Sequence, residues 1–190
     1  MRIERVHETP AHETAWAVAA YETLVSDRMW VLNATGATPA PVLQNLLIHL
    51  ADGHSWDTVI SAPVDEKMVT AATQPLSDAG WKHTVDGRWV RWTSPDGDAG
   101  VQFDAFAAQH ASHNLATWTI WADPGPDRPT WAITASPHTP SSLLADLSET
   151  LAHETGTRQA QPGREHRTRL AAGAPAAPAV TAGRPASRSR

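Results

Sequence analysis

The chain has 190 residues and a formal net charge of −5, with nine tryptophans and no cysteine. The lack of cysteine excludes disulfide bonds and a thiolate metal site. The N-terminal residues MRIERVHETP contain no apolar signal region, and no apolar run has the length of a membrane span. We therefore expect a cytoplasmic protein with no membrane partner.

The first part of the chain predicts two strands and one helix. Residues 1–13 are polar, and we expect them to be poorly ordered. Within residues 14–53, alternating apolar side chains favour strands over Ala15–Ala20 and Trp30–Thr35. A helix is expected over Pro39–Ala51, since proline suits the first helical position, where its missing N–H is not needed.

Residues 54–154 predict a helix, about five antiparallel strands and a second helix. The segment His54–Ala62 is β-prone and fits either a linker or a strand. A helix over Asp65–Ala79 must be kinked or split by Pro75. The five strands are expected at Trp81–Val85, Arg88–Thr93, Gly100–Phe106, Thr117–Ala122 and Trp131–Ala135, and Asp86-Gly87 is a hairpin signal between the first two. Thr139 and Pro140 then begin the last helix, whose apolar face holds Leu143, Leu144, Leu147 and Leu151.

Two segments of the chain resemble each other. Trp30–Ala51 and Trp131–Ala152 align without gaps, with eight of 22 positions identical and a Thr-Pro pair before each helix. We interpret this as a duplicated unit, partial in 14–53 and full in 54–154. A two-strand remnant is not stable alone, so we favour its pairing with the second copy. The alternatives are dimerisation through an unpaired edge and a start codon further upstream.

The fold class that follows is α+β: a mainly antiparallel sheet with flanking helices, built from a partial and a full copy of the unit. The run AGWKHTVDGRWVRWTSPDG, followed by PTWAITASPHTP and an Ala/Leu helix, resembles an uncharacterised actinobacterial family, the domain of unknown function 317, which usually has two tandem copies. The similarity covers about Ile60–Glu154 and Trp16–Asp52. The resemblance implies no activity, cofactor or catalytic residue, and the first copy departs from the family because its front half is missing.

The C-terminal residues 155–190 differ from the rest of the chain. They contain seven arginines and one glutamate, and almost no apolar residues, so we expect them to be disordered. The rest of the chain, residues 1–154, has more acidic than basic residues and therefore a net negative charge. A basic tail of this kind offers Arg184, Arg188 and Arg190 as contacts to nucleic acid, and the simpler alternative is a solubilising tail.

The tryptophans suggest an interaction face. Trp89 and Trp92 point to opposite faces of one strand, as do Trp118 and Trp121 of another. We predict that Trp92 and Trp121 lie on the sheet face away from the core, where tryptophan is typical of binding hot spots. The alternative is that the helix at 65–79 or the first copy covers them.

Catalytic and metal motifs are missing from the sequence. His110 and His113 are two imidazoles, fewer than the three or four ligands that zinc needs, and there is no nucleophile, phosphate-loop or dinucleotide motif. We predict no cofactor and no metal. The predicted function is a non-catalytic module that binds a protein partner through its Trp-bearing face or an open sheet edge, as a monomer or homodimer. The remote alternative is an enzyme with a site around His110, His113 and Asp104.

Overall fold

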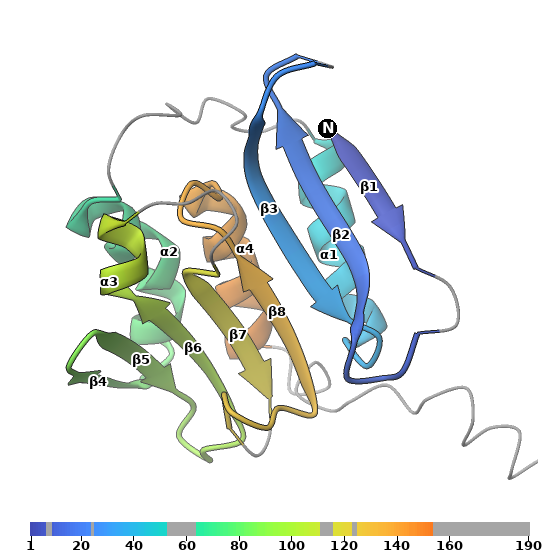
Figure 1. The fold of residues 1–190 in the computed structure, drawn as a ribbon. Helices are drawn as coiled ribbons and strands as arrows, with labels where there is room; N and C mark the ends of the chain where they lie inside the picture. Colours follow the sequence, from blue (N-terminus) through green and yellow to red (C-terminus); the bar gives the residue numbers. More distant parts are fainter. Residues whose placement is uncertain (7–8, 24, 53–63, 111–115, 123–124, 154–190) are drawn as a thin grey trace, which may run out of the picture.

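The computed structural model describes residues 1–6, 9–23, 25–52, 64–110, 116–122 and 125–153 (Figure 1). These residues form one eight-stranded antiparallel sheet with the order β1-β2-β3-β8-β7-β6-β5-β4. The strands are β1 (Arg2–Arg5), β2 (Thr14–Tyr21), β3 (Arg28–Thr35), β4 (Lys82–Asp86), β5 (Trp89–Thr93), β6 (Ala99–Asp104), β7 (Trp118–Ala122) and β8 (Trp131–Ala135). The helices are α1 (Ala40–Ala51), α2 (Glu66–Asp78), α3 (Ala105–Gln109) and α4 (Ser141–His153). The predicted α+β class with a mainly antiparallel sheet is confirmed.

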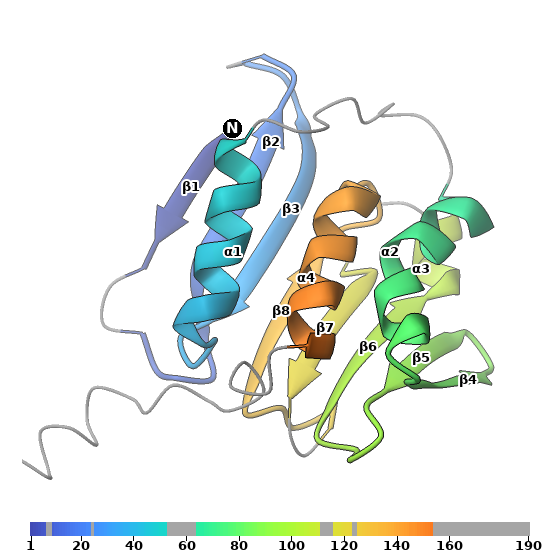
Figure 2. The ribbon, with the colours of Figure 1, turned by 180° about the vertical axis from the view of Figure 1, so that it is seen from behind.

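Three of the helices cover one face of the sheet. Figure 2 shows α1, α4 and α2 side by side on that face, and α4 packs against both neighbours. Figure 1 shows the opposite face, which we call the open face. None of the helices in the described ranges is long and apolar enough to cross a membrane.

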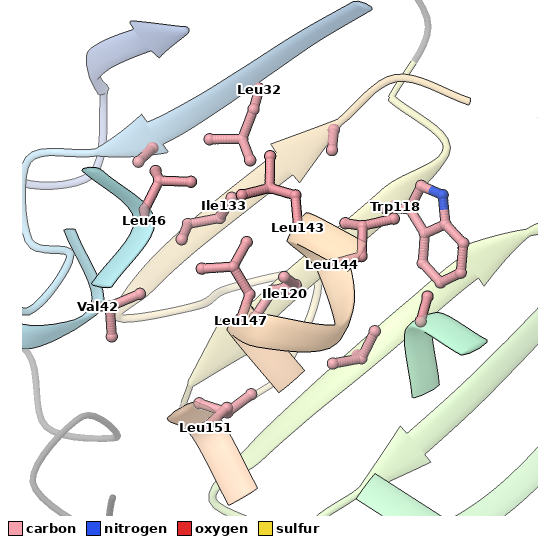
Figure 3. Close-up of a cluster of buried hydrophobic side chains, with 14 of the residues drawn as sticks. Leu32, Val42, Leu46, Trp118, Ile120, Ile133, Leu143, Leu144, Leu147 and Leu151 are labelled. Carbon is pink, nitrogen blue, oxygen red and sulfur yellow. The ribbon is translucent and has the colours of Figure 1, made fainter. Parts of the chain in front are cut away.

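The core lies between the sheet and this helix layer. Leu46 of α1 and Leu147 of α4 point toward Leu32, Ile120 and Ile133 of the central strands (Figure 3). The three largest fully buried side chains are Trp30, Trp118 and Trp131. The burial of each aliphatic side chain stabilises the fold by roughly 1.5–3 kcal/mol. This burial holds α1 and α4 against the same sheet.

Two local features differ from the sequence predictions. Strand β1 forms over Arg2–Arg5, within the N-terminal stretch expected to be irregular, and its partner is β2. Of the kink or split expected at Pro75, the split is excluded, because α2 is one helix from Glu66 to Asp78. This proline lies in the last turn, so its missing N–H removes only one hydrogen bond close to the helix end.

The two halves of the sheet meet through equivalent strands. Antiparallel β3 and β8 pair with Asn33 opposite Thr134, and these two residues occupy equivalent positions when the segments are aligned. The expected pairing of the first segment with the second is therefore confirmed.

The hydrogen bonds beside this pair are reciprocal. The Val31 N–H donates to Ser136 Oγ at 3.0 Å, and the Ala132 N–H donates to Thr35 Oγ1 at 3.0 Å. An approximate two-fold axis through Asn33 and Thr134 relates the two sides. It places β1-β2-β3-α1 opposite β6-β7-β8-α4, so the first segment has three strands rather than the two expected.

Candidate functional site

A groove of about 380 Å³ lies on the helix side of the sheet, between α2, α3 and the strands β4 to β6. Its apolar lining comes from all of these elements. The apolar side chains are Val69 of α2, Val85 of β4, Val90 and Trp92 of β5, Phe103 of β6 and Ala108 of α3. Polar rim residues include Asp65 and Glu66.

The β4–β5 hairpin sets the groove wall. Gly87 in the turn has a φ of +59°, a conformation that favours glycine. The hairpin pairs His83 with Trp92 and Val85 with Val90. Because side chains alternate along a strand, all four lie on the helix side of the sheet.

The side chains of the groove wall range from buried at Trp92 to exposed at Val85. Trp92 is only 5% exposed and stacks on the His83 ring with a centroid distance of 5.1 Å. Val85 is 65% exposed, which is high for a large apolar side chain. The groove therefore opens at β4, the outermost strand on this side.

The rim beside the start of α2 is acidic. Asp65 caps the helix by accepting a hydrogen bond from the Met68 N–H at 2.8 Å, and Glu66 is exposed next to it. No lysine or arginine lines the groove in the described part of the chain. This rim favours a cationic group over an anionic one.

Strand β4 itself is an open edge. All five of its residues are exposed, and within the described sheet β5 is its single neighbour. Such an edge presents backbone N–H and C=O groups that can pair with another extended chain.

The structure places the two predicted interface tryptophans on opposite faces. The expectation that Trp92 lies away from the core is wrong, because β5 pairs Trp92 with Val101 of the core side and leaves Trp89 on the open face. Trp121 lies on the open face, opposite Gly100, but it is only 5% exposed. The alternation of side chains along β5 correctly predicted that Trp89 and Trp92 lie on opposite faces of the sheet. Which of the two lies on the core side depends on the pairing of β5 with β6.

Among the other predicted residues, only His110 and Asp104 are described, and neither lines the groove. Arg184, Arg188, Arg190 and His113 lie outside the described residues. His110 follows α3, and its Nδ1 is 2.9 Å from the Phe106 carbonyl oxygen.

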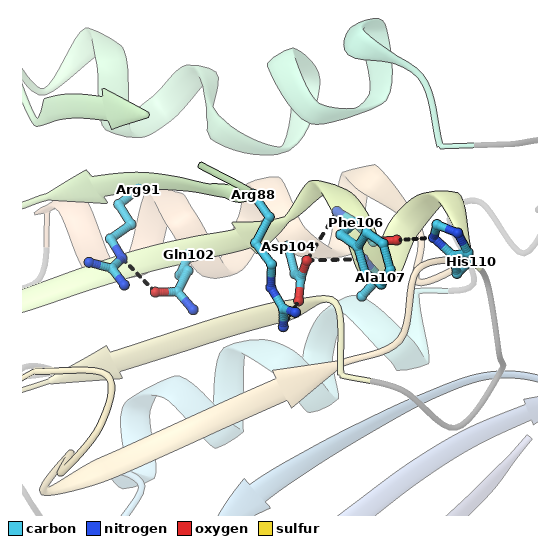
Figure 4. A network of polar contacts seen from close by, with 7 residues as sticks. All are labelled: Arg88, Arg91, Gln102, Asp104, Phe106, Ala107 and His110. Carbon is cyan, nitrogen blue, oxygen red and sulfur yellow. Dashed lines mark hydrogen bonds and ion pairs between the residues drawn. The ribbon is translucent and has the colours of Figure 1, made fainter. Parts of the chain in front are cut away.

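Asp104 has a structural role at the start of α3. Its carboxylate accepts hydrogen bonds from two helix N–H groups and pairs with Arg88 at 2.6 Å (Figure 4). Among the described side chains, no group of three His, Asp or Glu is placed to hold a metal ion.

Comparison with known proteins gave one family. Residues 1–56 and 93–157 match the model of SPDY, a domain of unknown function (DUF317). The first stretch contains β1 to α1, and the second contains β6 to α4. Neither the curated proteins nor the solved structures contained a match. Since the matched stretches make up more than half of the sequence, the chain belongs to the DUF317 family.

Proposed function

We propose that this protein is a non-catalytic module that binds an extended segment of a partner protein at the β4 edge. The observation that carries the proposal is an apolar groove that opens directly beside an unpaired strand edge. The partner segment adds to the sheet as a further strand next to β4. Backbone hydrogen bonds then supply affinity, and every second side chain faces the groove and supplies specificity.

The lining of the groove indicates the chemistry of that segment. An aliphatic or aromatic side chain fits between Val69, Val85 and the edge of the Trp92 ring. A lysine or arginine one or two positions away is favoured by the rim carboxylates of Asp65 and Glu66. An acidic segment is disfavoured, because the described lining offers it no lysine or arginine.

Selection from a random peptide display library against the full chain tests this function. We expect enriched peptides to share an apolar residue flanked by a basic one. Val85→Asp places a charge in the groove and is expected to weaken such a peptide about tenfold or more. Thr84→Asp is the matched control, since Thr84 is the preceding residue of β4 and faces the opposite side, beside Arg91. Equal loss in both variants, or enrichment of acidic peptides, would contradict the proposal.

We also infer that β1-β2-β3-α1 and β6-β7-β8-α4 are copies of one unit. Three observations support this: the identical positions in the aligned sequences, the reciprocal hydrogen bonds across β3 and β8, and the family match to both stretches. If so, other members of the family will show identities at the same aligned positions in both segments. Similarity confined to the Thr-Pro pair would argue against duplication.

A further inference from the structure

Aromatic and cationic side chains gather on the open face, on the other side of the sheet from the groove. Arg88, Trp89, Phe106 and His110 form what we call the stacking cluster. The Arg88 guanidinium carbon is 4.3 Å from the centre of the Trp89 ring and 5.8 Å from that of Phe106. The Phe106 and His110 rings stack with a centroid distance of 4.1 Å and an interplanar angle of 27°.

Asp104 holds the cluster in place. One carboxylate oxygen accepts hydrogen bonds from the N–H groups of Phe106 and Ala107 at 3.0 Å each, and the other pairs with Arg88 (Figure 4). The Asp104 side chain is almost completely buried. The Arg88 guanidinium and the backbone that carries Phe106 are therefore held in place before any ligand arrives, which reduces the entropy that binding must offset.

Phe106 and His110 are exposed to solvent, and Trp89 is half-buried. Phe106 is 52% exposed, and half of the Arg88 side chain is accessible. A single exposed ring is common on protein surfaces, but here Phe106 is clustered with His110, Arg88 and Trp89, and a contiguous patch of this kind is typical of a binding site. Since rings of the cluster already stack on one another, a planar group is the shape that extends the stack.

The charge around the cluster is opposite to that of the rest of the body. Residues 1–154 have 19 acidic and eight basic residues. Three of those eight, Lys82, Arg88 and Arg91, belong to the β4–β5 hairpin. Register places Lys82 and Arg91 on the open face with Trp89. Their carboxylate neighbours are Asp86, at the edge opposite Trp89, and the buried Asp104.

The guanidinium of Arg91 is also oriented. Its Nε donates to Gln102 Oε1 at 2.6 Å, and Gln102 is almost completely buried (Figure 4). This bond fixes one edge of the guanidinium, and its terminal nitrogens remain the donors for an anion. Arg91 and Trp89 are two residues apart on one strand, so a cation and a ring stand side by side on the same face.

We propose that this face binds single-stranded nucleic acid. Bases stack on Phe106 and Trp89, and the phosphates between them contact Arg91 and Lys82. A ligand that alternates planar rings with anionic groups matches a surface that alternates rings with cations. In a nucleic acid this alternation is built into every nucleotide, whereas a peptide presents it only with a particular sequence. This site is distinct from the groove, which lies on the other face and has an acidic rim.

Fluorescence anisotropy of a labelled twelve-nucleotide oligo-dT with the full chain, over a series of salt concentrations, tests the proposal. Phe106→Ala is expected to weaken binding about tenfold, because one stacked base is lost. Phe106→Trp keeps a ring and is expected to bind like the parent. Arg91→Gln is expected to reduce the slope of log affinity against log salt by about one contact.

Two matched controls make the outcomes distinct. Ile48→Ala removes an exposed apolar side chain from α1, and Arg128→Gln removes an exposed arginine from the β7–β8 connection; neither is expected to change the affinity. Circular dichroism of each variant checks that it is folded. Affinity that survives Phe106→Ala and Arg91→Gln but falls when Arg184, Arg188 and Arg190 are all changed to Gln would overturn the proposal in favour of the tail. Failure to bind oligo-dT would also overturn it, without affecting peptide binding in the groove.

Discussion

The segments β1-β2-β3-α1 and β6-β7-β8-α4 have the same internal arrangement but different surroundings. In the second, β6 pairs with β5 and α4 packs on α2, where Ser148 Oγ donates to the Ala72 carbonyl at 2.8 Å. In the first, β1 is an exposed edge of the described sheet. Leu47, at the position equivalent to Ser148, is half-buried, and no described helix lies beside α1 on the side away from α4 (Figure 2).

This difference locates the candidate sites. The groove and the stacking cluster are both built with α2, β4, β5 or α3, which have no counterpart among the described residues of the first segment. Most of α2, β4 and β5 falls between the two stretches that match the family model. The two similar segments thus supply most of the sheet and of its core, and the additional elements supply much of the surface on which binding is proposed.

The largest expected effect comes from the shared core, where the two halves are alike. Leu46 and Leu147 occupy equivalent positions on α1 and α4, and each is 1% exposed. Leu46→Ala and Leu147→Ala are each expected to lower the free energy of unfolding by about 2–5 kcal/mol, through lost burial and an internal cavity. Urea unfolding measures both. If the free energy of unfolding fell by less than about 1 kcal/mol at one of the two positions, the two leucines would not have equivalent roles in the core.

Gly100 distinguishes the halves. A Cβ at this residue would overlap ring carbons of Trp121, whereas the equivalent pair in the first segment is Arg2 opposite Ala19. Gly100→Ala is expected to cost about 1–3 kcal/mol by overpacking. In a double-mutant cycle with Trp121→Ala, the two losses are expected to be strongly non-additive. Additive losses would show that the ring does not lie on Gly100.

The reciprocal hydrogen bonds between β3 and β8 give another test of whether the two halves are alike. Ser136→Ala and Thr35→Val each leave one backbone N–H, of Val31 or Ala132, without its hydroxyl acceptor. We expect each to lower the free energy of unfolding by about 1–2 kcal/mol. Thermal unfolding of both variants checks this, and the more buried Ser136 is expected to show the larger loss. An unchanged melting temperature for both variants would show that these two hydrogen bonds do not stabilise the fold.

The smallest effect concerns Asp146, which stands where α1 has Asn45. Burial raises the pKa of Asp146, Glu149 raises it further, and His49 opposes the shift. The ionised carboxylate is therefore disfavoured by folding, a penalty fully present above the folded pKa and absent below the ordinary value. Asp146→Asn is expected to stabilise the protein at neutral pH by about 0.5 kcal/mol or less, since water screens a partly exposed group.

The pH dependence supplies the check on Asp146. The advantage of Asp146→Asn is expected to shrink as the pH falls through the folded pKa of the carboxyl group. Thermal unfolding at neutral pH and near pH 3 measures it. A stabilisation that is the same at both pH values would assign the effect to something other than this carboxylate.

Much of the architecture followed from local sequence. Alternation around Trp30, Trp118 and Trp131 predicted the central strands, and the Thr-Pro pairs predicted where α1 and α4 begin. These features depend on a few consecutive residues. Strand β1 was missed, because its four residues are all exposed and show no apolar alternation; its partner strand lies about ten residues away.

The candidate sites depended on register, which local patterns do not determine. Val85 and His83 face the groove only because β4 and β5 pair as they do, and Trp92 lies on that side because it stands opposite Val101. Helix α3 was predicted as part of a strand and a loop. The helix begins after Asp104 because the carboxylate of this residue accepts hydrogen bonds from the Phe106 and Ala107 N–H groups. That signal, an aspartate directly before an Ala-rich run, was present in the sequence.

Amide hydrogen exchange of the full chain, with and without a peptide selected on it, tests the central claim most directly. The account predicts slower exchange in β4 and in the first turns of α2 when the peptide is bound, because β4 gains a neighbouring strand and the groove loses access to water. Exchange in β1 is expected to stay unchanged. Protection confined to β1, or to the open face of β7 and β8, would contradict the assignment of the binding edge.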